Sequence, residues 1–332
     1  MSKAIFLCNT PKNIDWVYGS GRREKIAELT ELYPQIVTKE NIHLHLPAIQ
    51  QAEVIFSTWG MFVPEVEHMN AFANLNAIFY AAGSVHHFAR PFLEQDIMVI
   101  SAREANAQPV AEFTLAQILL ACKGYFQNVQ KYAEQKQRDF SIYKESKGCY
   151  GESVALIGCG VIARKLIELL KNFDLNILVY DPYLSDNEAD QLGVTKVSLE
   201  DAFARGYVVS NHAPDNEGTA GMLHKGLFEK MRDNATFINT GRGRTVVEKD
   251  LLEVFKKRPS LTALLDVTTH EPPEKDSELY TLPNVHLSPH IAGSIGDEVL
   301  RMADFCIDAY CDWSEGKTVR GQVTFDMLEN MA

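Results

Sequence analysis

Short apolar runs alternate with amphipathic stretches along almost the whole chain. The stretches 22–32 and 64–73 carry apolar side chains at helical spacing and predict helices. They separate apolar runs that predict strands over residues 3–8, 52–57, 77–81 and 97–100. Strands that alternate with helices build a parallel sheet with helices on its faces. This part of the chain is therefore predicted to be a small open α/β domain.

A long amphipathic helix is predicted next, from Ala107 to Arg138. Its apolar face is formed by Val110, Phe113, Leu115, Ile118, Leu119 and Cys122. The β/α alternation then resumes, with a helix predicted over 161–172. Further strands are predicted over 154–158, 176–180, 207–210, 235–239, 261–267 and 285–287. About six strands are enough for a complete doubly wound sheet.

The remainder of the chain is too short for a third domain. Only about 40 residues follow His290, and residues 297–313 predict one long helix. We expect this helix to return and pack on the first domain. The predicted fold is α/β with two doubly wound open sheets. A Rossmann nucleotide-binding domain (105–294) is inserted into a smaller, flavodoxin-like substrate domain (1–104 and 295–332).

The second domain opens with a dinucleotide fingerprint, Leu-Ile-Gly-Cys-Gly-Val-Ile-Ala over residues 156–163. Gly158 and Gly160 suit a tight turn out of a strand. They also let a pyrophosphate approach the backbone N–H groups at the helix start, at Val161 and Ile162. The alternative is a plain β-α turn. Because the motif follows a predicted strand and opens an amphipathic helix, we favour a nucleotide site.

Asp181 ends the next predicted strand, in Val-Tyr-Asp-Pro-Tyr. An acid about 20 residues after the glycines accepts hydrogen bonds from the adenosine ribose of a bound dinucleotide. Its charge would repel a 2′-phosphate. The sequence therefore predicts NAD rather than NADP as the cofactor.

Arg242, Glu271 and His290 are the main candidates for chemistry. They lie in Asn-Thr-Gly-Arg-Gly, Thr-His-Glu-Pro-Pro and Ser-Pro-His-Ile-Ala-Gly, each after an apolar run. All three are thus predicted at strand ends, where open α/β sheets bind ligands. Each has an ordinary alternative: a surface arginine, a solvated loop acid, a structural histidine. Beside a nucleotide site, an arginine fork for a carboxylate and an acid-oriented imidazole indicate hydride and proton transfer on a 2-keto or 2-hydroxy acid.

Size and charge exclude several other functions. The chain has 332 residues, 46% of them hydrophobic, which is enough for two cores. Lys and Arg total 32 against 44 Asp and Glu, giving a formal net charge of −12 without a basic run. We therefore expect no nucleic-acid partner. We also expect no membrane association, because no apolar run approaches the roughly 20 residues of a spanning helix.

Cysteine and histidine spacing argues against structural metal sites and disulfides. No C-x-x-C pair occurs among Cys8, Cys122, Cys149, Cys159, Cys306 and Cys311. The pairs His43/His45 and His86/His87 lack acidic or cysteine companions nearby in the sequence, so we expect no metal. Reduced, mostly buried thiols are typical of a cytoplasmic protein.

The whole chain resembles the D-isomer-specific 2-hydroxyacid dehydrogenases, nearly end to end. The motifs around Arg242, Glu271 and His290 carry the resemblance, with Ala-Asn-Ala-Gln-Pro-Val-Ala-Glu (105–112) and His-Ala-Pro-Asp-Asn-Glu-Gly-Thr (212–219) in support. The resemblance implies that the three residues are catalytic and that NAD is the cofactor. It also implies that Asp266 contacts the nicotinamide carboxamide. The other implied cofactor contacts are His212, Ala213, Pro214, Thr219, Thr240 and Gly293.

A substrate site follows from the same resemblance. It implies that backbone N–H groups around residues 82–85 hold the substrate carboxylate. Trp59 is expected as a pocket wall, with a core tryptophan as the alternative. Ser84, His86 and Phe113 depart from the family pattern, which usually has a glycine, an acid and a histidine there, and this bears on substrate identity. The implied substrate-binding residues are Trp59, Gly83, Ser84, Arg242 and His290.

We therefore expect an NAD-dependent oxidoreductase that interconverts a small D-2-hydroxy acid and its 2-keto acid. Glyoxylate and hydroxypyruvate reductases are the nearest models, and the resemblance suggests a homodimer. One alternative is a nucleotide-sensing interaction protein, since corepressors share the fold, although the chain shows no extended terminal arms. Another is a relative that oxidises formate or phosphite.

Overall fold

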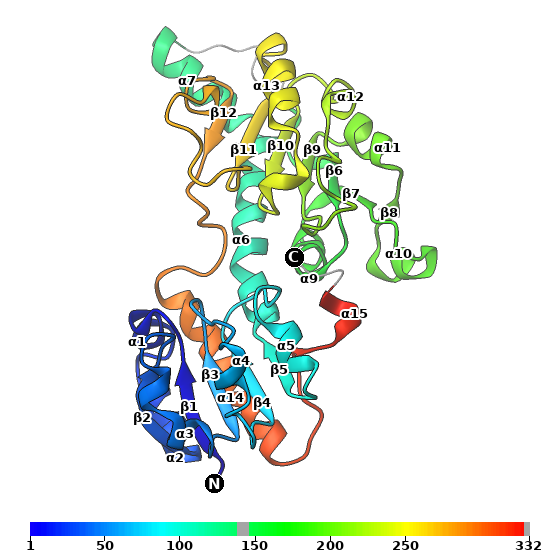
Figure 1. Cartoon of the computed structure of the whole chain (residues 1–332). Helices are drawn as coiled ribbons and strands as arrows, with labels where there is room; N and C mark the ends of the chain where they lie inside the picture. The colour runs from blue at the N-terminus through cyan, green and yellow to red at the C-terminus, as the bar shows by residue number, and fades with distance from the viewer. Residues whose placement is uncertain (138–145, 329–332) are drawn as a thin grey trace. The chain divides into compact units, whose positions relative to one another are not determined.

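The computed structural model describes residues 1–137 and 146–328 of the chain, shown in Figure 1. The chain divides into two compact units. Among the described residues, unit 1 consists of Met1–Ala107 together with 294–328, and unit 2 lies within Gln108–Gly293. Each unit is built around its own sheet.

Unit 1 contains a six-stranded sheet in the order β13-β5-β4-β3-β1-β2. Its strands are β1 (Lys3–Leu7), β2 (Glu31–Val37), β3 (Val54–Ser57), β4 (Ala77–Tyr80), β5 (Met98–Ser101) and β13 (Gln322–Val323). The first five are parallel and β13 pairs antiparallel with β5. The order 2-1-3-4-5 is that of flavodoxin-like sheets.

Helices cover both faces of this sheet. They are α1 (Pro11–Val17), α2 (Arg22–Leu29), η1 (Ile42–Leu44), α3 (Leu46–Ile49), α4 (Val66–Met69), α5 (Ala89–Leu93), η4 (Gly296–Val299), α14 (Leu300–Ser314) and α15 (Phe325–Leu328). The C-terminal helix α14 packs on the same face as α1 and α2, where Phe305 and Tyr310 join an apolar cluster with Phe56 and Phe79. Helix α14, which covers most of the helix expected over 297–313, therefore packs on the sheet of unit 1.

Unit 2 contains a seven-stranded parallel sheet in the order β12-β11-β10-β9-β6-β7-β8. Its strands are β6 (Tyr150–Ile157), β7 (Asp174–Tyr180), β8 (Thr195–Lys196), β9 (Val208–Asn211), β10 (Thr236–Asn239), β11 (Thr262–Leu265) and β12 (Val285–Leu287). Counted within the unit, the order 3-2-1-4-5-6-7 contains the Rossmann arrangement 3-2-1-4-5-6. The predicted fold class is confirmed for both sheets.

The helices around the second sheet form two layers. They are α6 (Arg103–Cys122), α7 (Tyr125–Gln135), α9 (Val161–Leu170), α10 (Asp186–Leu192), α11 (Leu199–Arg205), α12 (Lys225–Phe228), η2 (Gly243–Thr245), α13 (Glu248–Lys257) and η3 (Glu278–Tyr280). One layer comprises α11, α12 and α13, and the other comprises α6, α9 and α10.

The structure corrects three expectations about local elements. The predicted helix 107–138 is two helices, because Gly124 adopts a left-handed conformation (φ 64°) between α6 and α7; Arg138 lies outside the described residues. Strand β2 was not predicted from the sequence, because it contains Pro34 and lies at the edge of the sheet. An exposed edge strand does not need the apolar pattern by which the other strands were recognised. The helix predicted over 64–73 is present only as the short helix α4. Phe72, which lies beyond its end, is nevertheless buried.

Candidate active site

Strand pairing in unit 2 gathers the candidate cofactor residues at one edge of the sheet. Ile157 of β6 pairs with Tyr180 of β7 and with Asn211 of β9. The residues that follow these strand ends, Gly158, Asp181 and His212, therefore start from the same edge. The edge continues through β10, β11 and β12, where Asn239 pairs with Leu265 and Leu265 with Leu287. Every candidate motif of unit 2 begins at these strand ends.

The glycine-rich turn after β6 shows two different requirements for glycine. Gly158 has φ 91°, and an added Cβ there would lie 2.9 Å from the His212 carbonyl oxygen. Gly160 has an ordinary φ of −74°, and an added Cβ would meet no atom within 4 Å. The fold of the protein therefore requires glycine at position 158, whereas the glycine at position 160 leaves open space above the backbone.

Helix α9 begins at this open space. Its N-cap, Gly160, offers no side-chain hydrogen bond to the first turn, so the N–H groups there are not capped by it. Val161 and Ile162 are half-buried and Ala163 is fully buried against the sheet. Uncapped N–H groups and the positive end of the helix dipole suit a phosphate group.

Asp181 is fixed by the backbone on both sides. One carboxylate oxygen accepts a hydrogen bond from the Cys159 N–H at 2.7 Å, and the other accepts from the Tyr183 N–H at 2.7 Å. The carboxylate therefore ties the end of β7 to the glycine-rich turn. It remains half-buried, with its negative charge next to the turn.

The stretch after β9 forms a wall beside this turn. His212 is buried, and its Nε2 lies 2.9 Å from Ser210 Oγ. Burial lowers the pKa of His212 to about 4, so the ring is neutral at physiological pH. Its Nδ1 has no hydrogen-bond partner within the described residues.

The loop beyond His212 is closed by its own side chains. Ala213 N–H donates to the Asn211 side chain, and Thr219 Oγ1 donates to the Pro214 carbonyl at 2.6 Å. Arg244 forms ion pairs with Asp215 and Glu217 of this loop. These contacts connect residues 213–219 with the Arg242 segment.

Buried polar side chains hold the backbone around Arg242. Asn239 Oδ1 accepts from the Gly241 N–H at 3.1 Å, and its amide donates to the Arg242 carbonyl at 3.3 Å. Thr245 donates to the same carbonyl at 2.7 Å. Gly243 is required because an added Cβ would fall on the Thr268 carbonyl group. The segment after β10 is therefore rigidly defined, and Arg242 extends from it.

Thr240 faces α6 rather than open solvent. It is buried, and its hydroxyl lies 3.2 Å from that of Thr114.

Asp266 anchors the loop that carries His290. Its carboxylate, buried at the end of β11, accepts from the N–H groups of Ile291 (2.9 Å) and Ala292 (2.8 Å) and from the Ser288 hydroxyl. The His290 N–H donates to the Asp266 backbone carbonyl at 3.0 Å. His290 itself has φ 54°, an uncommon conformation for a residue with a side chain. Sequence reasoning missed this anchoring role of Asp266. Gly293 closes the loop at the end of unit 2.

Glu271 and His290 meet directly. His290 Nδ1 lies 2.7 Å from Glu271 Oε2, and both side chains are about half exposed. The two residues follow different strands, β11 and β12, so the pairing depends on the fold. When Nδ1 carries a proton toward the carboxylate, Nε2 is the nitrogen left for another molecule.

Arg242 belongs to the same charged group. Burial lowers the pKa of Arg242, while the charges of Asp215 and Glu271 act in the opposite direction. The side chain donates to the Gly241 carbonyl at 2.8 Å. A largely desolvated guanidinium beside a carboxylate–imidazole pair can bind an oxyanion or carboxylate strongly.

The remaining candidates lie in unit 1. Gly83 and Ser84 are half-buried after β4, and the Ser101 hydroxyl donates to the Gly83 carbonyl at 2.6 Å. Trp59 stacks on Trp16 at 5.9 Å between ring centroids and packs on both apolar clusters of the unit. Their part in substrate binding stays a prediction.

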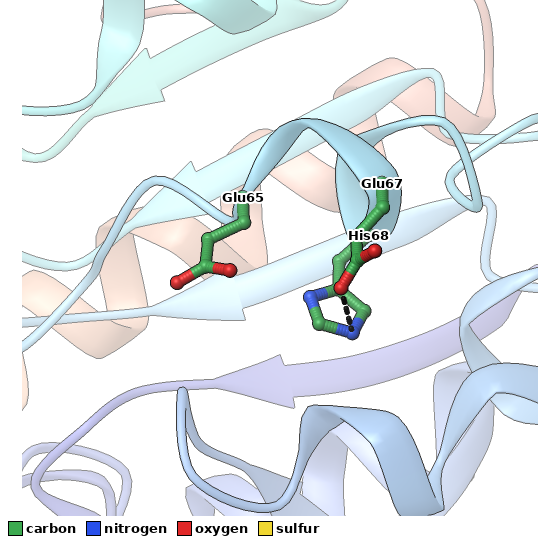
Figure 2. Close-up of side chains that lie close together, drawn as sticks. All are labelled: Glu65, Glu67 and His68. Carbon is green, nitrogen blue, oxygen red and sulfur yellow. Dashed lines mark ion pairs between the residues drawn. The ribbon is translucent and has the colours of Figure 1, made fainter.

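One group of possible metal ligands occurs among the described residues: Glu65, Glu67 and His68 at α4, shown in Figure 2. Glu67 lies 3.8 Å from His68, while Glu65 pairs with Lys39 at 3.7 Å. The group contains neither histidine pair considered from the sequence. The helices of the described ranges include none that is long and apolar enough to cross a membrane.

Comparison with known proteins places these features in context. Residues 115–292 match the family model for the D-isomer specific 2-hydroxyacid dehydrogenase, NAD binding domain. The chain is 31% identical over 237 residues to the D-3-phosphoglycerate dehydrogenase of Archaeoglobus fulgidus, covering 71% of this chain and 44% of that protein. It is 34% identical over 226 residues to YoaD of Bacillus subtilis, covering 67% of this chain and 65% of that protein. The alignments thus span less than two thirds of these relatives' lengths.

Solved structures show a similar fold over the full chain. A phosphoglycerate oxidoreductase from Rhizobium etli matches with a TM-score of 0.83 and 20% identity, covering 99% of this chain and 100% of that one. At this level of identity, the likeness concerns the arrangement of the elements.

Proposed function

The chain belongs to the D-isomer-specific 2-hydroxyacid dehydrogenase family, and from this we propose that it is an NAD-dependent oxidoreductase acting on a small D-2-hydroxy acid and its 2-keto acid. The single observation that carries the proposal is the contact of His290 with Glu271 at the sheet edge where Arg242 also lies. An arginine, an acid and an imidazole are the groups that a keto-acid reductase needs beside its cofactor.

The residues of unit 2 fit a bound NAD. The open space above Gly160 leaves room for a pyrophosphate, and the uncapped start of α9 offers N–H donors to it. Asp181 carries a fixed negative charge at the end of β7, where the adenosine ribose binds in this fold. The further cofactor contacts that we propose are Val161, Ile162, His212, Ala213, Pro214, Thr219, Thr240, Asp266 and Gly293.

Bound NADH supplies the hydride for reduction of a keto acid. We assign Arg242 the task of holding the substrate's carboxylate or carbonyl oxygen, where its positive charge stabilises the developing alkoxide. His290 donates a proton from Nε2 to that oxygen. Glu271 orients the imidazole through Nδ1. In the oxidative direction, His290 accepts the proton of the hydroxyl group.

The substrate loop lies in unit 1 in this proposal. Backbone N–H groups at Gly83 and Ser84 hold the substrate carboxylate, and Trp59 forms a wall of the pocket. In this proposal the substrate domain is 1–104 and 295–332, whose last four residues lie outside the described part, and the NAD domain is 105–294. These domains correspond to unit 1 and unit 2, whose boundaries lie a few residues away.

A substrate screen tests the proposal. Glyoxylate and hydroxypyruvate are the substrates that we propose first, followed by pyruvate, 2-ketoisocaproate and phenylpyruvate. We expect oxidation of NADH, followed at 340 nm, with at least one of them. Binding of NADH without turnover on the whole panel would favour a nucleotide-sensing role instead. Because Asp181 would oppose the 2′-phosphate, NADPH should bind roughly 30- to 1,000-fold more weakly, equivalent to about 2–4 kcal/mol.

We also propose a homodimer in the cytoplasm. Tyr125, Val129 and Tyr132 lie on one side of α7, and each is about half exposed. An apolar stripe of this kind supports association with a second copy. Six free cysteines support a reducing compartment. Light scattering should give twice the chain mass for the wild type, and Val129→Glu should lower it toward the monomer.

A further inference from the structure

Two cysteines of unit 2 are neighbours in the fold, and the proposed dehydrogenase chemistry uses neither of them. Cys122 ends α6 and is fully buried, and Cys149 immediately precedes β6 and is partly exposed. The Cys149 side chain is near enough to the Cys122 thiol to interact with it. Both pack in the apolar cluster between the sheet and α6.

The main chains around the two cysteines also run together. The Gly148 N–H donates to the Cys122 carbonyl at 2.9 Å. Two residues further along, an added Cβ at Gly124 would lie 2.5 Å from Ser146 Oγ. A disulfide needs Cα atoms about 4.4–6.8 Å apart. Backbones already joined by a hydrogen bond can meet this requirement with little movement.

The other cysteines have different surroundings. Cys8 donates to the backbone carbonyls of Thr10 and Trp59, and Cys306 interacts with Tyr18. Cys159 lies near Arg164 and Asp181 in the glycine-rich turn. Cys311 is partly exposed among acidic side chains. Cys122 and Cys149 thus differ from these four because each has another thiol among its neighbours.

We propose that Cys122 and Cys149 are a site of reversible oxidation, closing to a disulfide when the protein meets a peroxide. The inference goes beyond the proposed dehydrogenase activity and does not depend on it. A disulfide would link the end of α6 to the start of β6 and enclose α7 in the closed loop.

The chemistry needs only the peroxide as oxidant. Cys149 is the accessible thiol, and its sulfur attacks the peroxide, breaking the O–O bond and giving a sulfenic acid and water. The Cys122 sulfur then attacks the Cys149 sulfur. The S–S bond forms, the S–O bond breaks, and the hydroxide takes up the Cys122 proton to leave as water. Two electrons pass from the two thiols to the peroxide.

Burial, together with the neighbouring Cys149, raises the pKa of the Cys122 thiol above its ordinary range. Cys122 is therefore protonated at neutral pH and reacts slowly with an oxidant from solution. Attack on an adjacent sulfenic acid requires no diffusion. The order of events, with the partly exposed Cys149 reacting first and the buried Cys122 second, follows from this difference.

Peptide mapping of the full-length reduced protein tests the proposal. The protein is treated with a small excess of hydrogen peroxide, free thiols are alkylated, and the digest is analysed without reductant. We expect a peptide that joins Cys122 to Cys149, released by dithiothreitol, and two fewer free thiols than the six of the reduced chain. The oxidised protein should also melt about 5 °C or more above the reduced one, because the disulfide restricts the unfolded chain.

Variants define the outcome. Cys149→Ser should abolish both the joined peptide and the rise in melting temperature. Cys311→Ser, which removes another partly exposed thiol, should leave both unchanged. Cys122→Ser gives a second check if the buried substitution folds. A Cys149 that is oxidised without linking to Cys122, or a melting temperature that still rises in Cys149→Ser, would overturn the proposal.

Discussion

Asp266→Asn should disturb the His290 loop more than its conservative size suggests. In the native protein, one carboxylate oxygen accepts from Ile291 N–H and the Ser288 hydroxyl, and the other accepts from Ala292 N–H at 2.8 Å. Asparagine keeps an acceptor oxygen at only one of these two positions and places an NH₂ group at the other. Its NH₂ group must then face a backbone N–H, so that a donor opposes a donor.

The size of the effect follows from the hydrogen bonds that the substitution removes. If the asparagine oxygen takes the position that accepts from Ile291 and Ser288, the hydrogen bond from the N–H of the buried residue Ala292 is lost. A hydrogen bond to a charged group contributes about 1.5–3 kcal/mol, and a stranded buried N–H costs about 1–3 kcal/mol more. The loop should lose about 2.5–6 kcal/mol, which is below most of the typical range of total stability, about 5–15 kcal/mol, but enough to open the loop locally.

Hydrogen exchange and kinetics measure this effect. Peptides covering residues 288–293 should exchange faster in Asp266→Asn, and turnover should fall on the order of 100-fold because the imidazole loses its fixed position. Asp233→Asn is the matched control, since Asp233 is an exposed partner of Arg258 at 2.7 Å and should change little. Unchanged exchange of residues 288–293 in Asp266→Asn would refute the anchoring role.

Three further substitutions test other parts of the account. Gly160→Ala should leave the free energy of unfolding of the apo protein within about 0.5 kcal/mol of wild type, because the added Cβ meets no atom. It should nevertheless weaken NADH binding measured by calorimetry. Equal affinity would mean that Gly160 does not belong to the cofactor site. Gly243→Ala should cost about 3 kcal/mol or more, because its Cβ would fall on the Thr268 carbonyl, and an unchanged melting temperature would contradict this. Glu152→Gln weakens a two-pronged pair with Arg232 (2.6 and 3.0 Å) and should cost about 1–2 kcal/mol at pH 7. Burial opposes ionisation of Glu152, but hydrogen bonds from Arg232 and the Ser153 N–H outweigh this effect and lower the pKa of Glu152. The difference in free energy of unfolding between wild type and Glu152→Gln should therefore shrink as the pH falls below 4.5. A difference that stays constant with pH would argue against the ion pair.

Much of the fold could be predicted because parallel strands impose a simple pattern. Apolar runs bounded by glycine, proline or polar residues identified β6, β7 and β9 to β12, and the motifs at their ends had to meet at one edge. The helix break at Gly124 could not be predicted in this way. A glycine within a helix costs only about 1 kcal/mol, so the sequence alone does not decide between a continuous helix and a break.

The residues proposed to carry out the chemistry could be found in the sequence more readily than the residues that hold their loops in place. Arg242, Glu271 and His290 stand out as polar residues at strand ends. The anchoring role of Asp266 depends on donors about 25 residues further along the chain, in a loop whose course the sequence does not reveal. Asn239 similarly acts on its own loop through buried hydrogen bonds. The available signal was a polar residue at the end of a buried strand, as for Asn239, or directly after one, as for Asp266.

A double-mutant cycle on Glu271 and His290 tests the central claim most directly. Turnover with NADH and the best keto acid is measured for wild type, Glu271→Gln, His290→Gln and the double variant, with NADH binding checked in each. If the 2.7 Å contact makes the pair a functional unit, His290→Gln should lose most of the turnover, and adding Glu271→Gln should lower it by less than about threefold more. Losses that simply multiply would contradict the account, because they would mean that the two side chains act independently.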